Sequence, residues 1–202
     1  MSVDCYGFHA PSGGGSYNLV LVDFAATVTL SSAITTTDFR MFAGSTSQTA
    51  DDRDITVTSY FRWTGGTINS SAFVGKLNID GAVGLIEPGG GTVTTGDTIQ
   101  FLNGATGTFY DGTVNFTGGE GISVGGGCEA NFEIGTAGIN LDYSGPIPSQ
   151  GKIILQAGAT GTFYRKAGIT GLTSGNIDMP IVITGGIFTV HENVNLPMFG
   201  GQ

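Results

Sequence analysis

Phe163-Tyr-Arg-Lys-Ala-Gly-Ile-Thr-Gly-Leu-Thr-Ser-Gly-Asn-Ile-Asp-Met-Pro-Ile-Val-Ile-Thr-Gly-Gly-Ile-Phe-Thr-Val190 is the stretch of sequence that decides the fold of this chain. Short runs of two or three alternating apolar residues are separated by corners of Gly, Thr, Ser and Asn, and no helical period appears. Chains built in this way throughout stack short strands into a solenoid instead of folding around one compact core. We therefore expect an all-β fold, a parallel β-helix (β-solenoid) of about eight to ten irregular coils.

Runs of strand-like residues recur along the rest of the chain at the length expected of solenoid strands. Residues 1–17 form an expected N-terminal arm, with the flexible segment Pro11–Ser16 inside it. The solenoid is expected to span residues 18–196, and a C-terminal tail residues 197–202. The runs cover residues 19–22, 26–30, 39–42, 55–58, 60–63, 76–79, 98–102, 113–116, 130–134, 138–141, 152–155, 181–183 and 187–190.

Internal repeats support the stacked arrangement. The segment Gly104-Ala-Thr-Gly-Thr-Phe-Tyr110 recurs without change as Gly158–Tyr164. A second motif, an alternating apolar pair followed by Thr-Gly-Gly, predicts a corner, because glycine accepts the positive φ that ends a strand. This motif occupies residues 61–66, 114–119 and 181–186.

The composition excludes several classes of partner. Charged residues make up 11% of the chain, the net charge is −9, and there are only seven Lys and Arg residues. Nucleic acid and anionic membranes both require a clustered basic surface, so neither is expected as a partner. No apolar run reaches the roughly 18 residues of a membrane-spanning helix, and the first twenty residues do not resemble a signal peptide. We therefore expect either a fragment of a secreted protein or a chain that is exposed in another way, as a virion protein is.

The run Arg53-Asp-Ile-Thr-Val-Thr-Ser-Tyr-Phe-Arg-Trp-Thr-Gly-Gly-Thr-Ile68 is followed by Gly75-Lys-Leu-Asn-Ile79. Together with residues 112–134 and 163–190, these segments resemble the Gly/Thr-rich repeats of very large bacterial extracellular, adhesin-like surface proteins. The resemblance covers roughly residues 53–196. It implies a right-handed parallel β-helix at a cell surface or outside the cell, and it implies no catalytic residues. The chain departs from the family by being short and by having Ile181-Val-Ile where the repeats have Phe-Asn-Asn. Because of these departures, a self-contained virion protein stays an alternative hypothesis.

Acidic residues offer an alternative, enzymatic interpretation. Glycosidases use two carboxylates about 5–10 Å apart, and β-helix enzymes carry such acids on adjacent coils. The candidates are Glu120, Glu129, Glu133 and Asp142, which lie within one or two coils of each other. Since 16 acidic residues on so few coils produce chance neighbours, a polysaccharide lyase or glycosidase stays the second hypothesis. No cofactor is expected.

Aromatic residues are the preferred binding candidates. Tyr110 and Tyr164 occupy equivalent positions in the repeat, next to phenylalanines, and in an alternating strand one residue of each pair faces outward. Outward tyrosines would form a ladder for a glycan or another partner, whereas inward ones would pack at an edge of the solenoid. Trp63 would bind a sugar if exposed and would otherwise belong to the core.

Three further features of the sequence each allow a functional and a structural interpretation. Asp51, Asp52 and Asp54 could bind Ca²⁺ but lack the spacing of a calcium loop, so a solvated loop is preferred. Cys5 and Cys128 could form a bridge or remain free thiols. Paired threonines could form an ice-binding face, although they recur at uneven intervals; the pairs are Thr27/Thr29, Thr35/Thr37, Thr56/Thr58, Thr92/Thr94, Thr106/Thr108 and Thr160/Thr162.

The sequence thus favours a non-catalytic, exposed structural or adhesive β-solenoid module. Its expected partners are a glycan, a surface or other copies of itself, in a cell-surface protein or on a virion.

Overall fold

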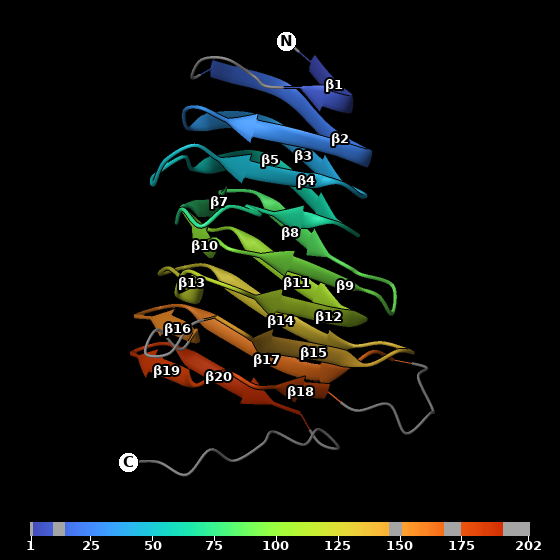
Figure 1. Ribbon diagram of the computed structural model, residues 1–202. Coiled ribbons are helices and arrows are strands. Elements are labelled where there is room, and N and C mark those ends of the chain that lie inside the picture. The colour runs from blue at the N-terminus through green and yellow to red at the C-terminus, as the bar shows by residue number, and fades with distance from the viewer. Residues whose placement is uncertain (1, 10–14, 146–150, 168–174, 192–202) are drawn as a thin grey trace.

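A computed structural model describes residues 2–9, 15–145, 151–167 and 175–191 of the chain. Twenty strands stack in parallel into one elongated β-solenoid of about seven turns, and no helix occurs in these ranges (Figure 1). The expected all-β solenoid is therefore confirmed. The number of turns is below the expected eight to ten, because several coils are longer than their short strands suggest: Leu141 pairs with Ile177, 36 residues later.

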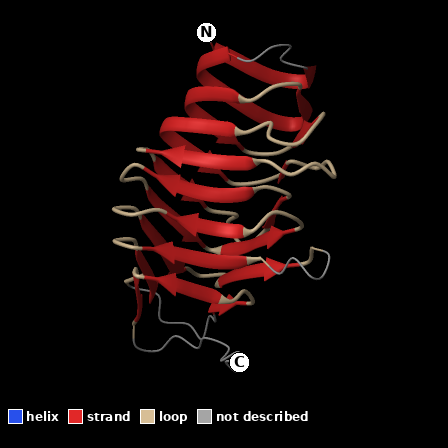
Figure 2. Cartoon of the chain, turned by 90° about the vertical axis from the view of Figure 1, so that its left-hand side faces the viewer, coloured by secondary structure: helices blue, strands red, loops and turns tan. Residues whose placement is uncertain are grey.

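The strand pairings divide into three stacks, which we call faces A, B and C (Figures 1 and 2). Four N-terminal strands are long enough to serve more than one face: β1 (Ser2–His9), β2 (Gly15–Leu30), β3 (Ile34–Met41) and β5 (Ile55–Trp63). Face A continues with β7 (Lys76–Asp80), β10 (Thr98–Leu102), β13 (Gly121–Val124), β16 (Lys152–Gln156) and β19 (Ile181–Thr184). Face B continues with β8 (Val83–Ile86), β11 (Thr106–Tyr110), β14 (Glu129–Ile134), β17 (Thr160–Arg165) and β20 (Ile187–Val190). Face C contains β4 (Ser45–Gln48), β6 (Thr67–Ile68), β9 (Thr92–Thr95), β12 (Gly112–Phe116), β15 (Ile139–Tyr143) and β18 (Gly175–Ile177).

The first residues of the chain belong to the solenoid. Residues 2–9 form β1, which pairs in parallel with β2, and β2 itself begins at Gly15. The expectation of an arm over residues 1–17 was wrong for these strands, because a neighbouring parallel strand satisfies their backbone groups. Residues 10–14 of that arm and the expected tail 197–202 lie outside the described ranges.

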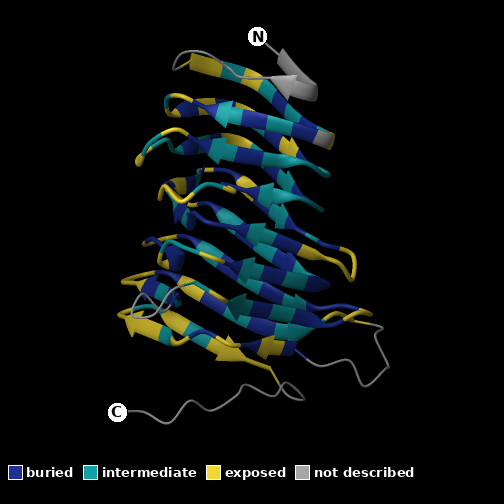
Figure 3. Ribbon diagram, in the orientation of Figure 1, coloured by how far each residue is buried: buried dark blue, intermediate teal, exposed yellow. Residues whose placement is uncertain are grey.

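The core is a column of buried apolar residues contributed by the strands of all three faces, which are dark blue in Figure 3. On face A, Ile79, Phe101, Val124 and Leu155 follow one another in register and are all fully buried. Strict alternation of buried and partly exposed residues runs through most strands, as in the pattern of β14. The two-residue period read from the sequence is therefore confirmed as the in-and-out pattern of solenoid strands.

The repeated heptapeptide marks equivalent places two coils apart. Phe109 of the first copy pairs with Phe132 of β14, and Phe132 pairs with Phe163 of the second copy. The rings of Phe109 and Phe132 stack with their centroids 5.1 Å apart. The repeat therefore reflects one recurring position on face B.

Candidate functional site: a groove along one corner of the solenoid

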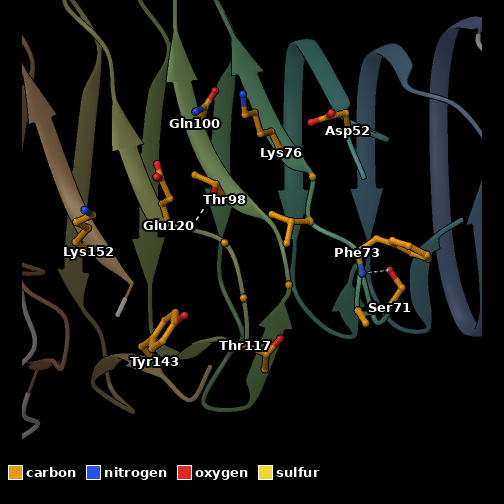
Figure 4. A pocket seen from close by; sticks show the side chains of 16 residues that line it. Asp52, Ser71, Phe73, Lys76, Thr98, Gln100, Thr117, Glu120, Tyr143 and Lys152 are labelled. Atoms are coloured by element: carbon orange, nitrogen blue, oxygen red, sulfur yellow. Dashed lines mark hydrogen bonds between the residues drawn. The ribbon is translucent and has the colours of Figure 1, made fainter. Parts of the chain in front are cut away.

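A groove of about 900 Å³ runs along the corner at which each coil passes from face C to face A (Figure 4). Its lining comes from successive coils, so the groove extends along the solenoid axis. Glycines occupy turning positions along the groove, and they leave backbone uncovered by side chains there. The corner residues that line it are Gly75, Gly96, Gly118 and Gly119.

Two aromatic residues stand at different positions along this groove (Figure 4). Phe73, in the loop after β6, is 41% exposed although it is a large apolar side chain. Tyr143, at the end of β15, fits between two glycines, and a Cβ on Gly151 would overlap its ring. The Tyr143 hydroxyl is buried and has no hydrogen-bond partner among the described residues. The groove thus combines exposed aromatic surface with polar groups.

Charged side chains of both signs line the same groove: Asp52, Lys76, Glu120 and Lys152. Within the described residues, none of them belongs to an ion pair. Between Lys76 and Lys152 lie uncharged polar residues, including Gln100. Such a surface offers hydrogen bonds and unneutralised charge to a ligand along its length.

A buried carboxylate supports the groove from beneath. Asp97 is fully buried and accepts hydrogen bonds from Asn69 Nδ2 (2.6 Å), the Gly75 amide (2.9 Å) and Gln48 Nε2 (3.0 Å). Asn69 Nδ2 also donates to the carbonyl oxygen of Phe73 at 2.6 Å. The network therefore holds the loop that carries Phe73 against the corner of the next coil.

Burial raises the pKa of the Asp97 carboxyl to about 6. The hydrogen bonds from Asn69, Gly75 and Gln48 lower this pKa, the charge of Asp54 raises it, and burial is the strongest influence. Charging a carboxylate away from water without a nearby cation is unfavourable, which explains the direction. Asp97 thus lies behind the groove lining, between Gly96 and Thr98, and its pKa lies near 6.

The acidic loop before β5 holds neighbouring coils together. Asp51 Oδ1 accepts a hydrogen bond from the Val74 amide, and Asp54 Oδ1 accepts one from the Lys76 amide, both at 2.9 Å. No group of three His, Cys, Asp or Glu residues in the described part of the chain could hold a metal ion. The carboxylates suggested as calcium ligands therefore bind backbone of the next coil, and Asp52 lines the groove.

The tyrosines of the repeat lie on the outer side of face B. Phe109 and Phe163 are fully buried, whereas Tyr110 and Tyr164 are partly exposed in the same row, with Glu133 between them. Burial, with a contribution from the charge of Glu133, raises the pKa of Tyr164. This row is a second surface that a partner could contact.

Trp63 is wrong as a binding candidate. Its side chain is fully buried, its Nε1 donates to the Gly65 carbonyl oxygen at 3.0 Å, and its ring meets Phe61 edge-on. A surface ligand cannot reach it. The alternation places it inward with the core residues of face B.

The four acids suggested for catalysis do not meet in one site. Glu120 lines the groove, Glu129 and Glu133 lie on face B, and Asp142 lies on face C. The pKa of Asp142 is raised, mainly by burial and then by the charge of Asp178 on the next coil. The predicted clustering of these acids is therefore not seen, because neighbours in sequence occupy different faces.

A bridge between Cys5 and Cys128 within the chain is also excluded. Cys5 pairs with Val22 in the first coils, whereas Cys128, a buried free thiol, directly precedes β14. Several strand spacings of about 4.8 Å separate them, well beyond the roughly 7 Å limit between bridged Cα atoms.

The paired threonines are divided among the three faces. Thr27 and Thr29 lie on face C, Thr56 and Thr58 on face A or directly after it, and Thr106 on face B. On face C the neighbours of the first pair are serines, with Thr27 Oγ1 and Ser45 Oγ 3.3 Å apart. A single regular threonine ladder does not run the length of a face in the described coils.

Neither the groove nor the role of Asp97 was predicted from the sequence. A signal for the groove exists in the glycine pairs at successive corners, although their alignment depends on coil length.

The part of the chain that the structure describes contains no helix long and apolar enough to cross a membrane. No family model, curated protein or solved structure matches this chain.

Proposed function

We propose that this chain is a non-catalytic, adhesive β-solenoid module that binds a linear glycan lengthwise in the corner groove. The observation that carries the proposal is the groove itself: a channel along the axis, floored by glycine backbone, lined by polar groups, with Phe73 and Tyr143 within it. Ligand sites combine apolar or aromatic contact area with a few polar groups that fix orientation. A linear polymer matches a channel that crosses several coils.

The distribution of acids supports binding over hydrolysis. Asp52 and Glu120 are the two acids that line the groove, and they lie at corners three coils apart, roughly 14 Å by strand spacing. Hydrolysis by paired carboxylates requires a separation of about 5–10 Å. A polysaccharide-acting enzyme therefore remains the less favoured hypothesis.

The proposed setting is an exposed one, on a cell surface or a virion, as the resemblance to adhesin-like repeats implies. Weak surface charge and rigid stacked faces suit a module that presents a surface to a glycan or to other copies of itself. Right-handed winding of the coils is part of the same proposal, because right-handed crossovers dominate parallel β structure.

Binding to immobilised linear polysaccharides, both neutral and acidic, tests the proposal. Phe73→Ser should weaken binding roughly threefold to tenfold, because losing one apolar contact costs about 1 kcal/mol. Val83→Ser is the matched control, since Val83 is 55% exposed on face B outside the groove. Absence of binding to every polymer, or equal loss in both variants, would contradict the proposal.

A further inference from the structure

The last described coil of the solenoid has open strand edges. Its strands β18, β19 and β20 each pair with one neighbouring strand, and no described strand covers their other side (Figure 1). Ile187 and His191 donate their amides to the preceding coil, so the amides of Phe188 and Val190 alternate to the open side. Unpaired edges of this kind pair readily with further β structure.

Side chains that continue the core column are uncovered at the same end. Ile183 follows Leu155 in register and is 51% exposed, and Val190 follows the fully buried Phe163 and is 40% exposed. Each earlier coil is covered by the coil after it. One more coil stacked on this end would bury both residues.

The opposite end of the solenoid offers one strand to each of these open edges. On β1, residues 2–6 pair with the face B part of β2, and residues 8–9 pair with its face C part. On face A the first described strand is residues 15–17 of β2, which pair with β3. All these pairings are parallel, so a second copy moved along the axis continues parallel pairing on every face. A contact between two like ends would reverse the strand direction.

The two ends also carry opposite charge, although the net charge of the chain is −9. Residues 151–191 hold three basic residues and one acid, whereas residues 1–41 hold three acids and one basic residue. The residues are Lys152, Arg165, Lys166 and Asp178 at one end, and Asp4, Asp23, Asp38 and Arg40 at the other. Glu192, which follows the last coil, still leaves that end positive. Charge complementarity therefore favours contact between unlike ends and opposes contact between like ends.

Arg165 and Asp23 are suitable residues to test this contact. Arg165 lines a surface hollow with Val190 and His191 of the last coil. Asp23 lies one strand from the other end, paired with Tyr6 of β1. If the stack continues in register, three strand spacings separate Arg165 of one copy from Asp23 of the next, roughly 14 Å.

We propose that copies of this chain stack head to tail, with the C-terminal coil of one on the N-terminal coil of the next, into a continuous solenoid. Contact between unlike ends is heterologous, so it extends into a filament and does not close into a dimer. The proposal concerns the ends of the solenoid and does not depend on what the corner groove binds.

Sedimentation velocity over a range of concentrations, with electron microscopy of the concentrated protein, tests the proposal. The wild-type chain should form filaments that lengthen with concentration. Their axial repeat should be roughly 34 Å, because each copy contributes about seven turns of about 4.8 Å.

Charge reversal identifies which ends meet. At low salt, about 10 mM, the Debye length of about 30 Å exceeds the separation of the two charges. Asp23→Lys and Arg165→Glu should then each weaken association roughly twofold to fivefold. The double variant should restore association, because it exchanges the two charges across the same contact. Lys76→Glu is the control, since it reverses a charge in the middle of the solenoid, and it should leave association unchanged.

Melting temperatures verify that each variant is folded. A chain that stays monomeric at every concentration would overturn the proposal, as expected if residues 192–202 or another protein cover the open end. A dimer that does not grow further, or a double variant that associates no better than the single ones, would overturn the head-to-tail contact. Glycan binding is measured separately, so none of these outcomes affects the proposed function.

Discussion

At the scale of single residues, Asp97 is the clearest departure from what a solenoid requires. A corner of this fold requires only a turn and hydrogen-bonded backbone groups. Asp97 adds a buried carboxylate without a neighbouring cation, which costs folding free energy. Its donors come from two other coils, Gln48 from β4 and both Asn69 and Gly75 from the loop between β6 and β7, so it ties three coils together beside the groove. Gln48 Oε1, by contrast, is buried without a hydrogen-bond partner.

Asp97→Asn should change how stability depends on pH. The raised pKa, about 6 against 3.8, means that the folded state binds the proton more tightly than the unfolded state. Protonated Asp97 therefore contributes its full stabilisation below about pH 4, and this contribution is lost as pH rises to about 6. The free energy of unfolding should fall by roughly 3 kcal/mol over this range. The variant should lack this fall and be the more stable protein at pH 7, since its amide can donate to Gln48 Oε1. Urea unfolding from pH 4 to 7.5 measures the effect, and parallel curves for both proteins would contradict it.

Phe24→Gly should relieve backbone strain. Phe24 has φ of +56° and is 69% exposed, in a conformation that bulky residues rarely adopt. Such strain costs on the order of 1–3 kcal/mol. Phe73→Gly is the control, because Phe73 is also exposed and has no positive φ. Thermal unfolding should give Phe24→Gly a free energy of unfolding about 1 kcal/mol or more above that of Phe73→Gly. The reverse order would refute the strain at Phe24.

At the scale of strands, the middle glycine of the repeated heptapeptide is explained by a phenylalanine ring that occupies the space where a side chain would lie. A Cβ on Gly107 of the first copy would overlap the Phe101 ring, and a Cβ on Gly161 of the second would lie 2.6 Å from the Phe188 ring. Glycine is required at this position because a phenylalanine from another strand packs directly over the backbone.

Gly107→Ala should therefore destabilise the protein by about 1–3 kcal/mol through overpacking. Gly84→Ala is a close control, since Gly84 is the register partner of Gly107 in the preceding coil. A Cβ at Gly84 would lie 3.6 Å from the nearest side-chain atoms, which is ordinary contact. Chemical unfolding should show the loss in Gly107→Ala alone, and equal losses would mean that the ring contact is not the cause.

At the scale of the whole molecule, the solenoid is asymmetric in its exposed apolar surface (Figure 3). Positions that are fully buried in earlier coils are open in the last described coil: Ile183 follows Leu155 in register and is 51% exposed. Ile187 is 65% exposed on β20. Strand edges next to such side chains favour pairing with further β structure.

Ile187→Lys should accordingly reduce concentration-dependent self-association, because a lysine at a strand edge opposes edge-to-edge pairing. Val83→Lys adds the same charge to an exposed position in the middle of face B and should leave association unchanged. Sedimentation velocity over a range of concentrations measures both. A wild-type chain that stays monomeric throughout would remove the basis for this prediction.

The sequence by itself determined the fold class, the alternation of inward and outward residues, and the corners. These properties are local: the two-residue period and the turn preference of glycine act within a few residues. Only the tertiary structure decided that the acids Glu120, Glu129 and Asp142 lie on different faces, that Trp63 is buried, and that glycine corners align into a groove above Asp97. The physical reason is register: coils of unequal length set which residues become neighbours, and strand pairing across tens of residues cannot be read from local pattern.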